Sequence, residues 1–404
     1  MNKIFKFSLS VLLIGSVLGG CSDNGSSSTT TTTEARTKPV NVRVKTPDGN
    51  VVQGATVAVG DETAQTNASG IAKLMLDPKK ESKAHIEKTG YVSQQVLVAA
   101  SAASDTPTYE AVVAQMKLVG EDVNFNQASR AKPITVTGSA GSKVTISSPN
   151  AWELEDEKGN KVTYKGPVDV YITPIDTTNL ATLAAFPGGF SGIPESGSSE
   201  TPIISWGMAD YTFKTNDGKE LDLANDVDAV IDIPLFQEGA NGEFDALGNG
   251  DKIPLWHYDY VAKTWKEEGK GIVEAAIVNG ENKKVVRATV SHFTPWNIDK
   301  AVTNGVTTHI SVSCPAGGGP TSAGGQLTLV SSAGGFSQSA YLNTDGVATF
   351  NSVPFSNNND ATNENCVSSS TAICDGVLAS VSRACFTIPG TDSEHRETVN
   401  AMWQ

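Results

Sequence analysis

The stretch VSHFTPWNID, residues 290 to 299, gathers the residue types most able to do chemistry in a chain that has only five histidines. His292 precedes Thr294 by two positions, and an imidazole can act as a general base toward a nearby hydroxyl. The alternative is structural, because Phe293 and Trp296 would each contribute roughly 2 kcal/mol to a buried core. We favour the structural interpretation, with His292 hydrogen-bonded at a strand end.

A second group of aromatic and polar residues, WHYDY, occupies positions 256 to 260. An exposed Trp256 and Tyr258 could form a stacking platform for a carbohydrate. However, successive side chains of a β-strand point to opposite faces, which places these two aromatics on one face and His257 and Asp259 on the other. We therefore favour a buried aromatic face, and the carbohydrate surface is the alternative.

The segment FDALGNGDKI carries three oxygen-bearing side chains, those of Asp245, Asn249 and Asp251. Hard cations such as Ca²⁺ prefer several such oxygens from one short segment. The spacing is not that of an EF-hand, and Asn-Gly more simply marks a turn. Motifs for a zinc protease, a P-loop or a dinucleotide site are absent from the sequence, so we expect neither a metal nor a catalytic cofactor.

Glycines and prolines are frequent between Ala184 and Gly197, which predicts a long exposed loop. Loops carried on β-sheets are common binding surfaces, so this loop is a further place where a partner could bind.

Four cysteines lie in the last hundred residues, and an even, clustered set in an oxidising compartment predicts two disulfides. Three connectivities are possible. We favour Cys366 with Cys374 as a staple within a loop, and Cys314 with Cys385 as a link between two strands.

Lys3 and Lys6 precede an apolar run from Phe7 to Leu18 that is too short for a permanent membrane span, as expected of a secretory signal. The following Leu-Gly-Gly-Cys resembles the bacterial lipobox. That resemblance implies removal of residues 1–20 and a diacylglycerol on Cys21, the only covalent group we expect. Ser22, after the cysteine, favours the outer membrane in such lipoproteins.

Residues 21–38 hold almost no apolar side chain, so they predict a flexible linker with a reach of about 20 to 25 Å. The formal net charge of the whole chain is −14, which argues against nucleic acid and against electrostatic binding to anionic lipid. Attachment to the membrane should therefore depend on the lipid, and we expect an envelope protein or glycan as the partner.

From residue 39 onward, apolar and polar positions alternate between closely spaced turns, which predicts antiparallel β-structure throughout. The phrases DGNVVQGATV, TNASGIAKL and KTGYVSQQVLV resemble the carboxypeptidase regulatory-like domain, a transthyretin-type β-sandwich without catalytic residues. This resemblance covers residues 39–118. Residues 119–300 resemble a β-rich module that follows such domains in bacterial surface proteins. Residues 301–404 repeat features of the first block, including AGGQLTL and LNTDGVATF, so we interpret them as a diverged second sandwich.

The middle block more distantly resembles the β-domain of tight-junction scaffolds and netrin receptors. Self-cleaving relatives of that domain split a His-Phe-Ser motif between Phe and Ser. His292, Phe293 and Thr294 match this motif with threonine in place of serine, while Pro295 departs from it. The resemblance implies ester formation through the Thr294 hydroxyl, with His292 taking the proton.

Together these features predict an all-β outer-membrane lipoprotein of tandem immunoglobulin- or transthyretin-like sandwiches that binds or scaffolds without catalysis. The alternatives are an autoproteolytic surface protein cleaved between Phe293 and Thr294, and a carbohydrate-binding surface lipoprotein.

Overall fold

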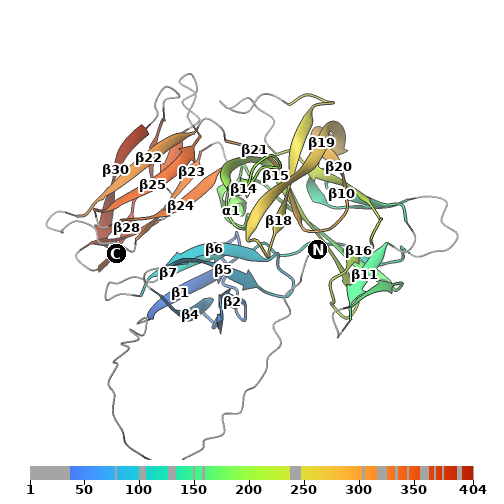
Figure 1. Cartoon of the computed structure of the whole chain (residues 1–404), viewed down its shortest axis with the longest axis horizontal. Helices are drawn as coiled ribbons and strands as arrows, with labels where there is room; N and C mark the ends of the chain where they lie inside the picture. Colours follow the sequence, from blue (N-terminus) through green and yellow to red (C-terminus); the bar gives the residue numbers. More distant parts are fainter. Residues whose placement is uncertain are drawn as a thin grey trace, which may run out of the picture.

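The computed structural model of this chain describes most residues after position 36, and nearly all of its regular structure is β-strand (Figure 1). The all-β prediction is confirmed. Among the described residues no helix has the length and apolar composition needed to cross a membrane. The described ranges are 37–77, 80–99, 106–125, 133–148, 151–156, 160–236, 247–302, 305–315, 325–332, 335–343, 345–354, 364–367, 370–374, 377–388 and 394–403.

The first unit contains two sheets, with strand orders β4-β1-β7 and β3-β2-β5-β6. Val40, Val42 and Val44 alternate with polar neighbours along β1 and are all fully buried, as the spacing of strand side chains requires. The strands are β1 (Lys38–Lys45), β2 (Thr56–Val59), β3 (Glu62–Gln65), β4 (Ile71–Leu76), β5 (Glu81–Glu87), β6 (Gln94–Ala99) and β7 (Thr108–Val112).

The second unit is built on an 11-stranded sheet with the path β8-β13-β15-β21-β18-β19-β20-β17-β10-β9, to which β14 adds through β15 and β19. A separate three-stranded sheet, β12-β11-β16, shares its hydrophobic core through Trp152 and Leu223. Its elements are β8 (Leu118–Val123), β9 (Ile134–Thr137), η1 (Ser139–Gly141), β10 (Lys143–Ile146), β11 (Trp152–Glu155), β12 (Lys161–Tyr164), β13 (Val168–Ile175), α1 (Leu180–Leu183), β14 (Ser191–Ile193), β15 (Thr201–Thr215), β16 (Asp222–Leu223), β17 (Ala229–Pro234), β18 (Lys252–Asp259), β19 (Thr264–Val278), β20 (Glu281–Val290) and β21 (Pro295–Ala301).

The third unit is a nine-stranded arrangement with the order β25-β22-β30-β28-β27-β23-β26-β29, and β24 pairs with β23. The strands are β22 (Val306–Ser313), β23 (Gln326–Ser331), β24 (Ser337–Tyr341), β25 (Val347–Val353), β26 (Asn365–Val367), β27 (Ser370–Cys374), β28 (Val377–Val381), β29 (Ala384–Phe386) and β30 (Glu394–Trp403).

The first and third units share one arrangement of three strands. β1 pairs antiparallel with β4 and parallel with β7, and β22 pairs antiparallel with β25 and parallel with β30. The turns that precede β4 and β25 also share one pattern of hydrogen bonds. Asn67 Oδ1 accepts from the backbone N–H groups of Ser69 and Ile71. Asn343 Oδ1 likewise accepts from those of Asp345 and Val347. Side chains that mimic a backbone turn in this way explain the shared sequence pattern.

Two disulfides stabilise the third unit, as predicted, but the favoured pairing is wrong. The long-range disulfide joins Cys314 to Cys374, and the cross-strand disulfide joins Cys366 to Cys385. Cys366 and Cys385 are direct partners in the antiparallel ladder of β26 and β29, with their Cα atoms 4.0 Å apart. This register, which brings distant segments side by side, decides the pairing.

The three units pack against one another through a common apolar cluster that includes Val112 of the first, Trp265 of the second and Phe336 of the third. Phe186 and Phe190 belong to this cluster and stack on each other, with ring centroids 4.1 Å apart. Both phenylalanines are buried and residues 191–193 form β14, so the prediction of a long exposed loop over residues 184 to 197 is wrong for most of that range, and only its end, residues 195–197, is exposed as predicted. The apolar side chains among its glycines fill the junction between units.

Hydrogen bonds reinforce the contact of the first unit with the second, which we call the Gln94–Gln95 seam after its two buried glutamines. Tyr258 donates through its hydroxyl to Gln95 Oε1 at 2.7 Å. Gln94 donates to the carbonyl of Ala184 at 3.3 Å and accepts from the N–H of Gly188 at 3.0 Å. In Figure 1, β6 accordingly lies beneath β18 and α1.

Candidate functional site

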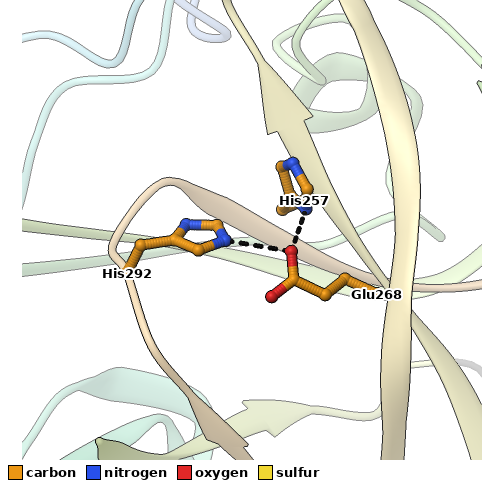
Figure 2. Close-up of side chains that lie close together, drawn as sticks. All are labelled: His257, Glu268 and His292. Atoms are coloured by element: carbon orange, nitrogen blue, oxygen red, sulfur yellow. Dashed lines mark hydrogen bonds and ion pairs between the residues drawn. The ribbon is translucent and has the colours of Figure 1, made fainter. Parts of the chain in front are cut away.

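Three side chains from separate segments of the second unit converge on one point. His257 lies on β18, Glu268 on β19, and His292 in the turn between β20 and β21. His257 Nδ1 is 2.9 Å from Glu268 Oε2, and His292 Nε2 is 3.1 Å from the same oxygen. Figure 2 shows both imidazole rings directed at this single carboxylate oxygen. We call this group the His–Glu–His cluster.

Strand register explains why His257 meets Glu268. His257 pairs with Lys266 across the antiparallel β18–β19 ladder, so Glu268 is its diagonal neighbour on the same face of the sheet. The ammonium of Lys266 binds Asp259 at 2.7 Å, which leaves Glu268 to the imidazole. Side chains alternate between the two faces of β18, so His257 lies on the face opposite the buried Trp256 and Tyr258.

An aromatic contact holds the second imidazole. The His292 ring stacks on the Trp296 indole, with centroids 4.9 Å apart and an interplanar angle of 29°. Trp296 also donates through Nε1 to the His292 carbonyl at 3.2 Å. The rings of His292 and His257 meet edge to face at 4.8 Å. Each ring is therefore fixed by packing as well as by the carboxylate.

The electrostatics of the cluster favour an ionised carboxylate. The adjacent imidazoles, first His257 and then His292, hold the pKa of Glu268 well below its ordinary value. His257 Nδ1 is close to the carboxylate but not aligned as a hydrogen bond, and His292 Nδ1 is buried without a hydrogen-bond partner among the described residues. The simple ion pair therefore leaves ring nitrogens unsatisfied.

The donor atoms of the His–Glu–His cluster all lie within 4.8 Å of one another, close enough to hold one metal ion. A second group with this spacing in the described part of the chain contains Glu364, Cys366 and Cys385. Its two sulfurs form the cross-strand disulfide and cannot act as thiolate ligands.

The residues of the predicted cleavage motif take separate roles. Phe293 lies in the aromatic core, with its ring centroid 4.2 Å from that of Phe213. Thr294 donates through Oγ1 to the Pro295 carbonyl at 3.3 Å, while the His292 ring faces Glu268. The backbone from residue 292 to 295 holds no positive φ angle and no cis peptide bond. The burial of Phe293 agrees with the packing interpretation, and cleavage stays a prediction.

The alternative prediction of a carbohydrate-binding platform at Trp256 and Tyr258 is wrong, because such a platform requires both side chains to be exposed. The side chains of Trp256 and Tyr258 are both 0 % exposed. Trp256 donates through Nε1 to the Asp299 carbonyl, and Tyr258 belongs to the Gln94–Gln95 seam. Their faces are covered by protein and cannot stack on a sugar.

The remaining predicted sites are only partly visible. Cys21 and Asp245 lie outside the described residues. Asn249 and Asp251 belong to a turn in which Asp251 Oδ2 accepts from the N–H of Gly248 at 2.6 Å. One carboxylate oxygen is thus used to close the turn, and the calcium site stays a prediction.

In the sequence, His257 and His292 belong to two separate motifs, and no pattern singles out Glu268. The available signal was the alternation of β18 and β19, which puts His257 and Glu268 on the faces opposite the buried aromatics. The register in which β18 pairs with β19 cannot be predicted from the sequence of either strand alone.

Comparisons with known proteins give little guidance. No protein-family model matches the chain, and no curated protein matches it. Among solved structures, the chain is similar to the major pilin subunit BcpA of Bacillus cereus (12 % identity, TM-score 0.20, covering 91 % of this chain and 100 % of that chain). It is also similar to the major pilin SpaD of Corynebacterium diphtheriae (10 % identity, TM-score 0.18, 91 % and 98 %) and to a membrane-associated protein of unknown function from Bacteroides fragilis (8 % identity, TM-score 0.17, 65 % and 98 %). Superpositions this weak assign neither a fold family nor a function.

Proposed function

We propose that this chain is a lipid-anchored protein of the bacterial outer membrane that binds or scaffolds an envelope partner without catalysing a reaction. The lipobox-like sequence at Cys21 supports the anchor, and the Ser/Thr-rich segment that follows supports a spacer between membrane and folded body. The acidic body leaves attachment to the acyl chains.

The packing of the three units is the observation that carries the proposal. Tandem β-sandwiches connected only by linkers would bend at each junction. Here buried glutamines of the first unit hydrogen-bond to the second, and the Gly335 N–H of the third donates to the Thr177 carbonyl of the second at 2.8 Å. Buried polar groups paired across a junction favour one relative arrangement. Such a body can present a defined surface to a partner.

The disulfides support an extracytoplasmic location. Disulfides persist in oxidising compartments such as the bacterial periplasm and cell surface. Both described disulfides occur in the third unit, where they join residues that are 60 and 19 positions apart in the sequence.

The anchor is tested with a Cys21→Ser variant expressed beside the wild-type chain. We expect the wild-type protein to incorporate a labelled fatty acid and to fractionate with outer membranes, and the variant to do neither. A matched Cys366→Ser, Cys385→Ser variant should keep the label. An unlabelled wild-type chain in the cytoplasm would contradict the proposal. Affinity capture from intact envelopes, with the lipidated chain as bait, then identifies the partner.

Autoproteolysis between Phe293 and Thr294 is the second candidate. The contact between His292 Nε2 and Glu268 Oε2 favours it, because a third group that orients an imidazole is part of such a catalytic arrangement, and His292 Nδ1 has no hydrogen-bond partner among the described residues. Intact mass of the purified chain distinguishes the two candidates: one species supports the scaffold, and a new amino terminus at Thr294 that disappears in a Thr294→Ala variant supports self-cleavage.

A further inference from the structure

We propose that His257, Glu268 and His292 form a binding site for one divalent transition-metal ion, with zinc the best match. The proposal goes beyond the scaffolding role and does not depend on it. Two imidazole nitrogens and one carboxylate oxygen are a ligand set found in zinc proteins, and a fourth position would remain for water or for a donor from a partner.

The distances within the cluster are close to those that a metal requires. Zinc bonds to nitrogen and oxygen are about 2.0 to 2.1 Å long, so ligand atoms around a tetrahedral ion lie roughly 3.3 Å apart. The two nitrogen-to-oxygen distances are 2.9 Å for His257 and 3.1 Å for His292. Both distances are slightly shorter than this spacing, and the two imidazole nitrogens lie within 4.8 Å of each other, so a rearrangement of these side chains would admit the ion.

The other histidines show why a simple ion pair explains this site less well. Each of them also faces a glutamate, as in the pairs His85–Glu87, His309–Glu394 and His395–Glu397. In those pairs each glutamate serves one imidazole, whereas His257 and His292 share a single oxygen of Glu268. Two rings converging on one oxygen is the arrangement expected when the true acceptor of their lone pairs is a cation at the centre.

The burial of the cluster also suits a cation. The side chains of His257 and His292 are 13 % and 22 % exposed, whereas that of Glu268 is 43 % exposed. The rings are thus held by the protein while an ion can still enter from solvent.

The surrounding contacts fix the proposed ligands in place. Trp296 stacks on His292 and binds its carbonyl, and β19 and β21 flank His257 on either side through regular pairing. Ligands whose orientation is set by outer contacts bind metals more tightly. The mixture of imidazole and carboxylate favours zinc and its neighbours in the first transition series over Ca²⁺ and Mg²⁺, which prefer all-oxygen sites.

The test uses the full chain, purified in detergent and stripped of metal with a chelator. Equilibrium dialysis against ZnCl₂ followed by elemental analysis should find one zinc ion per chain. Because loss of an outer-sphere partner alone costs about 10- to 100-fold in affinity, we expect His257→Gln, Glu268→Gln and His292→Gln each to weaken binding at least about 100-fold. The matched control is His309→Gln, which removes an imidazole that faces Glu394, a glutamate that pairs with no second imidazole in the described part of the chain.

A second readout separates loss of the site from loss of the fold. Co²⁺ added to the stripped wild-type chain should give the visible absorption of a tetrahedral or five-coordinate nitrogen and oxygen site, and ZnCl₂ should abolish it. Circular dichroism of the metal-free variants should match that of the wild type. Wild-type chain that binds no zinc above background, or zinc binding that survives all three substitutions in folded protein, would overturn the proposal. Loss of zinc in His309→Gln would overturn it equally.

Discussion

A buried carboxyl group in the second unit should make its stability depend on pH. Asp210 lies on β15 between β13 and β21, opposite Thr173 on one side and Pro295 on the other, and is only 4 % exposed. Burial raises the pKa of Asp210 from 3.8 to about 7. The hydroxyl of Thr212, which donates to Asp210 Oδ2 at 2.8 Å, limits this rise. The charges of Glu220 and Lys214 act in opposite directions and are smaller causes.

The sign and size of the effect follow from proton binding. Between pH 3.8 and about 7 the folded protein keeps a proton on Asp210 that the unfolded chain releases. The stabilisation is therefore complete below pH 3.8 and is lost as the pH rises through the folded pKa. One pKa unit corresponds to about 1.4 kcal/mol, so the free energy of unfolding should fall by on the order of 4 kcal/mol across the window.

An Asp210→Asn variant tests this expectation because its amide stays neutral at every pH. The variant should lose the part of the pH dependence that Asp210 carries and should exceed the wild type in stability at pH 8. Asp299, whose pKa is also raised by burial, should keep its own part of the pH dependence. A chain of several units need not unfold in one step. Stability is therefore read from urea unfolding at pH 5 and pH 8, followed locally by hydrogen exchange of the β15 peptide.

The matched control is Asp228→Asn, which changes an exposed carboxyl group of the same unit. It should retain the wild-type difference between pH 5 and pH 8. Equal slopes for Asp210→Asn and the wild type would refute the reasoning, because another group would then have to carry the proton.

Three further outcomes are expected. Replacing both cysteines of one disulfide by alanine should lower the free energy of unfolding, by up to about 4 kcal/mol for the long-range disulfide, which spans 60 residues, and by about 3 kcal/mol for the cross-strand disulfide, which spans 19. Equal losses of stability in calorimetry would contradict this loop-entropy argument. Gln95→Ala should destabilise the junction by about 1 to 3 kcal/mol, since the buried Tyr258 hydroxyl loses its acceptor, and faster proteolysis between the first two units is the measurement. Gly188→Ala should loosen the same seam, because Gly188 has φ +68° and an added Cβ would lie 2.3 Å from the Tyr258 ring; unchanged protease resistance would reject this.

The sequence predicted the elements of this fold better than their partners. Alternation explains the burial of Val40, Val42 and Val44, and the same rule correctly predicted a buried face for Trp256 and Tyr258. Each of these predictions depends only on neighbouring residues, because a strand that covers a core must direct every second side chain toward it. The exposed-loop prediction failed because Gly and Pro report local turns but not whether another unit covers them.

The candidate site required information that no local pattern holds. His257 and Glu268 meet through the diagonal of a strand pair, and His292 joins them from a turn after a third strand. The disulfide pairing failed for the same reason, since Cys366 faces Cys385 only in the final register of β26 and β29. Register between distant strands is set by the packing of whole sheets.

The parallel pairing of β22 with β30 constrains how the third unit can be made. β30 is the last described strand, and its residues 394–400 lie beside residues 307–313. During synthesis or export from the amino-terminal end, β22 is made long before its partner strand β30. Ser313, for example, pairs with Asn400, which lies nearly ninety residues later in the chain. Until then one edge of β22 has unpaired backbone groups that could join a strand of another molecule. Chains truncated before β30 should therefore be prone to aggregation and sensitive to proteases, even though the sequences of the first two units are complete.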